Sequence, residues 1–247
     1  HRGQEAAGIV SFDGENYHIS RKRGLVGDNF NSKNVIERLK GKSAIGHVRY
    51  STTGGDDERN IQPLFAELNF GGFALAHNGN LTNTNVLKTR LIEEGCIFHS
   101  SSDTEIIIHL IATNKKPDFM DRLIEALTLI KGAYSLVMLA KGCLYGARDP
   151  YGVRPLVLGK IGPSYFLSSE TCGFDIIGAE YIRDIEPGEI IRIKDNQIES
   201  IKPFARIGPR FCIFEFVYFA RPDSFVDGKN VYNVRKAIGK QLALEAK

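Results

Sequence analysis

The sequence has no long apolar run, no closely paired cysteines and little net charge. No apolar segment reaches the ~18 residues of a membrane-spanning helix, and no secretory leader is recognisable, so we expect no membrane partner. The four cysteines, Cys96, Cys143, Cys172 and Cys212, form no CxxC pair. That spacing favours reduced thiols in a cytoplasmic protein over a disulfide framework or a zinc site. The formal charge is only +3, so we expect no nucleic-acid partner.

The composition is otherwise typical of a globular protein. Its 247 residues are 43% hydrophobic and 25% charged, enough to bury one large core or two small ones. Apolar spacing predicts short strands on both sides of a group of helices. This order favours an α+β fold in one domain, with sheets stacked as in a sandwich.

The turn and capping signals place the individual elements. Ser102 and Glu105 have the spacing of a capping box, in which each side chain accepts a hydrogen bond from a backbone N–H at the helix start. Lys141-Gly142 has the length of a hairpin turn. The predicted strands are Ser43–Ser51, Gly72–His77, Ala133–Ala140, Cys143–Arg148, Leu156–Lys160, Tyr165–Ser168, Ile190–Ile193 and Ile198–Ile201, and the predicted helices are Thr82–Glu94, one opening at Ser102–Glu105, Phe119–Ile130 and Val231–Ala246.

Three sites near the ends of these elements carry polar groups suited to binding. Arg49 precedes a small polar run, residues 51–55, and its guanidinium can bind a carboxylate bidentately, although a surface ion pair explains it equally. Asn78-Gly79 offers an amide and an accessible backbone N–H, a good pair of oxyanion donors, but Asn-Gly also favours a hairpin turn. Asp103 suits the positive end of a helix dipole, where an ionised carboxylate can hold an ammonium group.

Two further segments favour a structural interpretation. Pro150 and Gly152 suit a turn between strands, and the neighbouring arginines and aspartate, within 148–154, suit an internal ion pair. The aromatic-rich segment 214–224 suits a core strand that ends in a polar turn.

Taken together, these segments resemble the N-terminal domain of the amidophosphoribosyltransferase family of class II glutamine amidotransferases. The resemblance covers essentially the whole chain. The RDPYGVRPL segment is shared widely among class II glutamine amidotransferases, whereas HRGQEAAGI and FEFVYFARPDS are more specific. The matching segments are His1–Ile9, His47–Thr53, Ala76–Asn83, Ser101–Glu105, Arg148–Leu156 and Phe214–Ser224.

The resemblance implies a fold and a mechanism. The fold is a four-layer αββα sandwich of the N-terminal-nucleophile hydrolase type. An N-terminal cysteine attacks the glutamine side-chain amide with its own α-amine as base, and the ammonia goes to a phosphoribosyltransferase (glycosyltransferase) domain. There it displaces pyrophosphate from phosphoribosyl pyrophosphate, giving 5-phosphoribosylamine in purine biosynthesis. By motif match, Arg49 binds the glutamine α-carboxylate, Asp103 its α-ammonium, and Asn78 with Gly79 forms the oxyanion hole.

The resemblance also implies functional features of the family that this sequence does not contain in full: the nucleophile, the second domain and a set of cluster ligands. The nucleophilic cysteine is expected upstream of His1, so residues 1–230 are expected to form a glutaminase domain without that segment. We therefore expect the 247 residues to hydrolyse glutamine negligibly. Residues 231–247 are expected to begin the second domain, which would hold magnesium. Cys212 matches one ligand of a 4Fe–4S cluster found in some members, although a buried structural thiol explains it more simply. A homo-oligomer, dimer or tetramer, is also expected.

Two alternatives stay open. Another class II amidotransferase, such as glucosamine-6-phosphate synthase, shares RDPYGVRPL but not FEFVYFARPDS. A non-catalytic module that binds glutamine or a partner domain is also compatible with the unmatched nucleophile.

Overall fold

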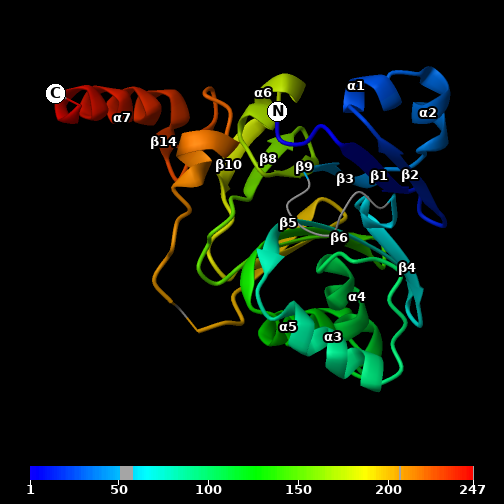
Figure 1. Ribbon diagram of the computed structural model, residues 1–247. Coiled ribbons are helices and arrows are strands. Elements are labelled where there is room, and N and C mark those ends of the chain that lie inside the picture. Colours follow the sequence, from blue (N-terminus) through cyan, green and yellow to red (C-terminus); the bar gives the residue numbers. More distant parts are fainter. Residues whose placement is uncertain (51–57, 206, 247) are drawn as a thin grey trace.

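A six-stranded antiparallel sheet forms the centre of the computed structural model, which describes residues 1–50, 58–205 and 207–246 (Figure 1). The strand order is β12-β11-β7-β6-β5-β4. Hairpins join β4 to β5, β6 to β7 and β11 to β12, whereas β5 and β6 are separated in sequence by three helices. The strands are β4 (Leu64–Leu68), β5 (Gly71–Leu81), β6 (Gly132–Ala140), β7 (Cys143–Arg148), β11 (Ile190–Lys194) and β12 (Gln197–Ile201).

Two three-stranded sheets form a second layer against one face of the central sheet. Their orders are β2-β1-β3 and β10-β8-β9. Val10 and Ile45 of the first sheet pack against Ala74 and Ala76 of β5, and Leu158 of the second packs near β11. The strands are β1 (Ala6–Phe12), β2 (Tyr17–Arg23), β3 (Ser43–Arg49), β8 (Val157–Ile161), β9 (Ser164–Ser168) and β10 (Glu180–Asp184).

Helices form the two outer layers. The helices α3 (Thr84–Glu93), α4 (Thr104–Thr113) and α5 (Phe119–Leu129) cover the other face of the central sheet, over the largest apolar core (Figure 1). The short helices α1 (Val26–Asn29), α2 (Lys33–Arg38) and α6 (Cys172–Ile177) lie outside the second sheet layer (Figure 1). The four-layer αββα sandwich is therefore confirmed, with a fourth layer of short helices.

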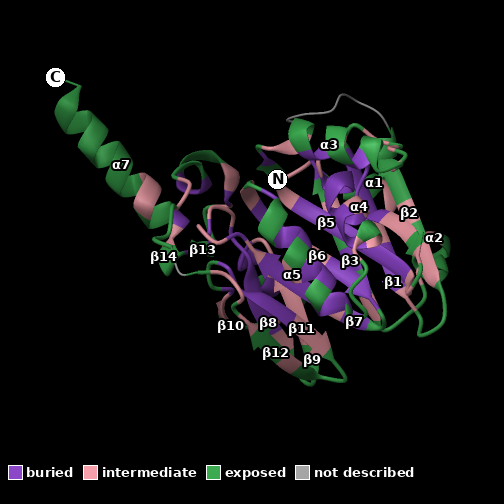
Figure 2. Cartoon of the chain, turned by 90° about the horizontal axis from the view of Figure 1, so that it is seen from below, coloured by how far each residue is buried: buried purple, intermediate pink, exposed green. Residues whose placement is uncertain are grey.

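The C-terminal region lies beside this sandwich. It contains η2 (Glu215–Phe219), a π-helical turn, then β13 (Phe225–Val226), β14 (Lys229–Asn230) and α7 (Val231–Glu245), while η1 (Glu58–Asn60) precedes β4. Helix α7 extends away from the body (Figure 2), and of its residues only Val231 is buried. Among the described residues, no helix combines the length and apolarity needed to cross a bilayer.

The helices and strands predicted between residues 43 and 201 are confirmed with ends within two residues, except that β5 continues four residues further than predicted. The Lys141-Gly142 hairpin has φ of 49° and 70°, and Asp195-Asn196 has φ of 49° and 59°. Positive φ at both central residues matches the right-handed twist of the flanking strands. The sequence analysis did not predict the strands β1, β2, β4, β10, β13 and β14 or the helices α1, α2 and α6.

Two segments differ from the prediction. Strand β5 continues to Leu81 and pairs Asn78 with Ser135 and Gly79 with Tyr134 of β6. Asn78-Gly79 is therefore inside a strand, and the hairpin-turn alternative is wrong. The segment 214–224 is also not a strand, because Glu215–Phe219 forms η2, and the fully buried Glu215 side chain is held by arginines rather than by a sheet.

The start of α4 differs from a capping box. Ser102 Oγ accepts a hydrogen bond from the Thr104 N–H at 3.3 Å. The Glu105 carboxylate accepts from the N–H groups of His99 and Ser100, at 2.8 and 2.7 Å. Glu105 therefore orders the preceding loop instead of closing a reciprocal pair with Ser102, and in doing so it places Asp103 at the N-cap.

These contacts make stability at acid pH depend on Glu105. Burial alone would raise the pKa of the Glu105 carboxyl, but the His109 ring, 3.6 Å away, and hydrogen bonds from His99 and Ser100 outweigh it and lower the pKa from 4.5 to about 2. The stabilisation is present above pH 4.5 and is lost as pH falls toward 2. We expect Glu105→Gln to lower the unfolding free energy at pH 7 and to flatten its decline between pH 4.5 and 2, measured by urea titration. An unchanged slope would contradict this role.

Candidate functional site

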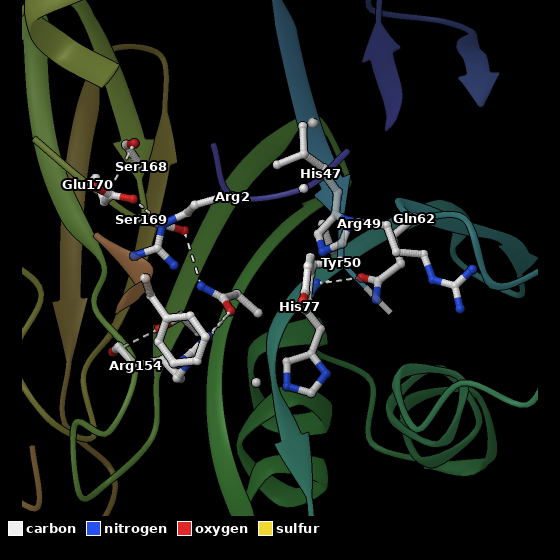
Figure 3. A pocket seen from close by; sticks show the side chains of 18 of the residues that line it. Arg2, His47, Arg49, Tyr50, Gln62, His77, Arg154, Ser168, Ser169 and Glu170 are labelled. Atoms are coloured by element: carbon white, nitrogen blue, oxygen red, sulfur yellow. Dashed lines mark hydrogen bonds and ion pairs between the residues drawn. The ribbon is translucent and has the colours of Figure 1, made fainter. Parts of the chain in front are cut away.

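A cavity of about 1320 Å³ opens between the sheets. All four residues singled out from the sequence, Arg49, Asn78, Gly79 and Asp103, line it. Figure 3 shows two groups of side chains on opposite sides: Arg49, Gln62 and His77 on one, Arg154 and Glu170 on the other. The whole polar run at residues 51–55, which follows Arg49 closely, lies outside the described residues.

The edge of β5 supplies a backbone donor to this cavity. Strand β4 pairs with β5 only from Gly71 to Leu75, and side chains then replace it as the partner. Gln62 Oε1 accepts from the His77 N–H at 2.7 Å, and Asp103 Oδ2 accepts from the Leu81 N–H at 2.8 Å. N–H groups two residues apart point to the same edge of a strand. The Gly79 N–H, midway between them, therefore points to this open edge.

Glycine is required at position 79 by close packing. A Cβ on Gly79 would lie 2.0 Å from the Ala133 carbonyl oxygen of β6 and 2.6 Å from His77 Nε2. Both atoms belong to packed elements, so β5 would have to move away from β6. Because glycine has no side chain, a ligand can also approach the Gly79 N–H closely.

Gly79→Ala is expected to destabilise the domain by about 1–3 kcal/mol, as overpacked buried positions do. Gly27→Ala is the matched control, since an added Cβ there meets no atom within 4 Å. Thermal unfolding of both variants measures the difference. Equal melting temperatures would show that β5 accommodates the methyl group.

Asn78 points to the opposite face of β5 from His77, because side chains alternate along a strand. Ala74 and Ala76 pack toward the second sheet layer, so Asn78 faces the space between the sheets. Its Oδ1 accepts hydrogen bonds from Arg154 Nη2 and Nε, at 3.0 and 3.3 Å. Its Nδ2 is 3.4 Å from Ser169 Oγ.

Arg49 and Asp103 bring opposite charges to the cavity. Arg49 ends β3, where its backbone pairs with Ala6, and the residue is only 7% exposed. The Asp103 carboxylate keeps one oxygen on the Leu81 N–H, while Oδ1 lies 3.4 Å from Thr104 Oγ1 and 3.7 Å from His77 Nδ1. A ligand with a carboxylate at one end and an ammonium at the other complements this pair.

Buried neutral side chains support this wall. Thr104 Oγ1 accepts from Gln62 Nε2 at 3.1 Å and contacts His77 Nδ1 at 3.3 Å. Burial lowers the pKa of His77, against the opposing charge of Asp103, and burial and the neighbouring His77 lower the pKa of His47 to about 4. Both rings are therefore neutral near pH 7, and they hold the strand and Asp103 without adding charge to the wall.

The opposite wall is a network of buried ions. Arg2 binds Glu170 through Nε and Glu215 through Nη2, the latter at 2.7 Å. Arg154 Nη1 lies 2.9 Å from the other Glu215 oxygen. Burial would raise the pKa of Glu170, but Arg2 and hydrogen bonds from Ser224 and the Arg221 backbone lower it overall. The two glutamates are thus neutralised by arginines.

One group on this wall has metal-ligating side chains. Ligand atoms of His1, Glu170 and Cys172 lie within 4.8 Å of one another, the one such group found among the described residues. The Glu170 oxygens already bind Arg2, Ser224 and the Arg221 N–H, so this group is an ion-pair cluster.

The expected metal and cluster sites have no complete ligand set among the described residues. Cys212 lines the cavity but belongs to no group of metal-ligating side chains in the described part of the chain. A 4Fe–4S cluster needs four such ligands, so three would have to come from elsewhere. The cluster and the magnesium site both remain predictions.

Sequence reasoning placed four residues in one site but missed most of the second wall. The structural interpretation holds for Arg148, which donates to the carbonyls of Arg154, Ile185 and Gly152, and for the buried Asp149, which accepts backbone N–H groups. The predicted Arg/Asp ion pair is wrong, since both bind backbone. Arg154, in contrast, lines the cavity. The only difference in the sequence is that Arg148 is followed by an aspartate, whereas Arg154 lies in GVRPL, which has none.

Comparison with known proteins places this cavity in a family. The family model for a glutamine amidotransferase domain matches residues 47–175. Amidophosphoribosyltransferase from Rhizobium etli is 50% identical over 251 residues, covering 100% of this chain and 51% of the relative. The Bacillus subtilis enzyme of the same name is 45% identical, covering 100% and 52%.

A solved structure agrees with these relatives. Glutamine phosphoribosylpyrophosphate amidotransferase from B. subtilis, complexed with ADP and GMP, superposes with a TM-score of 0.93 at 44% identity, covering 99% of this chain and 53% of that one. The chain spans about half the length of the curated relatives it matches. It therefore belongs to the glutamine amidotransferase domain family, and over its whole length it is similar to about half of these amidophosphoribosyltransferases.

Proposed function

We propose that this cavity hydrolyses glutamine to glutamate and ammonia. In the whole protein, the ammonia is transferred to phosphoribosyl pyrophosphate, giving 5-phosphoribosylamine in the first committed step of purine biosynthesis. The named activities of the relatives support this. Arg49 binds the glutamine α-carboxylate and Asp103 its α-ammonium, so that the side-chain amide extends toward Asn78 and Gly79.

The chemistry is acyl transfer through a thioester. A cysteine thiolate attacks the amide carbon, and the oxygen takes the negative charge. The Gly79 N–H and Asn78 Nδ2 donate to that oxygen. Ammonia then leaves with a proton from the nucleophile's α-amine, and water hydrolyses the thioester. Cys172 and Cys212 line the cavity, but burial raises the pKa of Cys172 and neither carries a free α-amine. The family resemblance implies a cysteine upstream of His1 in this role.

The observation that carries this function is the open position on β5. Gln62 and Asp103 occupy the N–H groups on either side of Gly79, and a reacting oxygen fits between them. Asp103 then has two tasks, since one oxygen orders the strand while the other faces the ligand.

The test uses the full-length protein with glutamine and with ammonia as alternative nitrogen sources. We expect glutamate release with glutamine, and pyrophosphate release from phosphoribosyl pyrophosphate and magnesium with either source. Pyrophosphate release with ammonia but no glutamate release with glutamine would overturn the assignment of the cavity. The alternative of another class II amidotransferase predicts amination of a different acceptor, and the relatives do not favour it.

The domain boundary and assembly follow from the same proposal. We place the glutaminase domain in residues 1–230 and the start of the phosphoribosyltransferase domain at 231–247, because the contacts printed between α7 and the body come from its N-terminal part, as far as Arg235. The dimer or tetramer is to be measured by sedimentation of the full-length protein.

A further inference from the structure

The arginine at position 154 contacts the amide that the proposed function uses. Its side chain is 16% exposed, and it reaches from the loop after β7 to β5 and to η2. Both contacts with β5 go to Asn78 Oδ1, at 3.0 and 3.3 Å. The Arg154 nitrogens Nε and Nη2 bind Asn78 Oδ1 and Nη1 pairs with Glu215, so we do not assign Arg154 as an oxyanion donor.

The guanidinium decides which way the Asn78 amide faces. Arginine has donors only, and an asparagine amide has an acceptor at one end and donors at the other. With Oδ1 toward Arg154, two hydrogen bonds form. A flipped amide would set Nδ2 against Nη2 and Nε, donor against donor, beside a cation. The remaining Nδ2 contact, to Ser169 Oγ at 3.4 Å, is long, so Nδ2 stays available as a donor.

Other groups hold Arg154 in place. Nη1 lies 2.9 Å from Glu215 Oε1, an ion pair with a fully buried side chain. The guanidinium also lies over the Phe219 ring, 4.5 Å from its centroid. Arg2 binds the other oxygen of Glu215 at 2.7 Å, which fixes the carboxylate. The ion pair with Glu215, the contact with the Phe219 ring and the two hydrogen bonds to Asn78 together fix the guanidinium in one orientation.

We propose that Arg154 is a positioning residue, which holds the Asn78 side-chain amide with Nδ2 toward the reacting oxygen, and that Glu215 and Phe219 of η2 hold Arg154. This rests on the proposed function, because it assigns Nδ2 a partner only in the transition state. A preorganised donor costs no reorientation when the charge develops. Lysine keeps the charge but not the fork, so it loosens the amide.

The experiment compares four variants of the full-length protein by steady-state glutamine hydrolysis: Arg154→Lys, Asn78→Ala, the double variant, and Arg183→Lys. The last is the matched control, since Arg183 also binds a fully buried glutamate, Glu189, at 2.6 and 2.8 Å, yet is not among the residues that line the cavity. We expect Arg154→Lys to lower kcat about 10- to 100-fold, less than the ~100- to 1,000-fold cost of deleting an oxyanion donor.

The expected KM for glutamine changes by less than about 3-fold, because orientation matters only as the charge develops. Asn78→Ala and the double variant should have kcat values within about 3-fold of each other, since Arg154 acts through an amide that is then gone. Arg183→Lys should keep wild-type kcat. If Arg154→Lys does not fold, Glu215→Gln, which weakens the ion pair that holds Arg154, takes its place. Its kcat is then measured alone and together with Asn78→Ala, and the same results are expected.

Two results overturn this inference while leaving the proposed function intact: Arg154→Lys with unchanged kcat beside an impaired Asn78→Ala, or a double variant whose kcat loss is the product of the two single losses. An Asn78→Ala variant with unchanged kcat overturns the oxyanion role in the proposed function and this inference together.

Discussion

Replacing Asn78 with alanine in the full-length protein is expected to lower kcat for glutamine hydrolysis by ~100- to 1,000-fold, the cost of one lost oxyanion donor. The side chain faces the cavity, and its Oδ1 is engaged by Arg154, which leaves Nδ2 for the reacting oxygen. The donor acts on charge that develops only in the transition state, so KM should move much less. Glutamate release measured at several glutamine concentrations separates the two constants.

Asn80→Ala is the matched control for this variant. Asn80 lies two residues further along the same face of β5 and also lines the cavity, and its amide donates to the carbonyl of Leu81 at 3.5 Å. We expect wild-type kcat. Pyrophosphate release with ammonia should also survive in Asn78→Ala, because it does not use this cavity. An effect confined to KM would place Asn78 in ground-state binding instead.

Changing Arg49 or Asp103, the charges proposed to bind the two ends of glutamine, should act mainly on KM. Truncating one partner of a buried charge pair costs about 2–5 kcal/mol of binding, which is about 30-fold to several thousand-fold in affinity. Arg49→Lys keeps the charge but cannot bind a carboxylate with two parallel hydrogen bonds. Asp103→Asn removes the charge but keeps an oxygen for the Leu81 N–H, now at 2.8 Å.

Both variants should therefore raise the KM for glutamine strongly while the fold is retained. Arg21→Lys serves as the control, because Arg21 lies on β2 and its guanidinium contacts the Ile61 carbonyl at 3.4 Å. An unchanged KM in Arg49→Lys would mean that the carboxylate binds elsewhere. Thermal unfolding of Asp103→Asn checks that the end of β5 stays in place.

The sequence by itself determined the elements whose signals are local. The Lys141-Gly142 hairpin formed because positive φ at both residues suits the strand twist. Helix α5 begins where Asp118 accepts a hydrogen bond from the Met120 N–H at 2.8 Å, as its capping residue predicts. The family segments also indicated Arg49, Asn78, Gly79 and Asp103 before their geometry was known, because each motif carries its residue at a fixed position.

Only the tertiary structure decided what those residues contact. Asn-Gly favours a turn locally, yet β6 pairs along β5 and keeps Gly79 in a strand, because long-range pairing outweighs a local preference. Glu215 and Arg154 are 61 positions apart, and Arg2 is farther still; no spacing rule connects them. Burial decided the outcome, since a carboxylate removed from water must be paired with cations, and the fold brings Arg2 and Arg154 to the same glutamate.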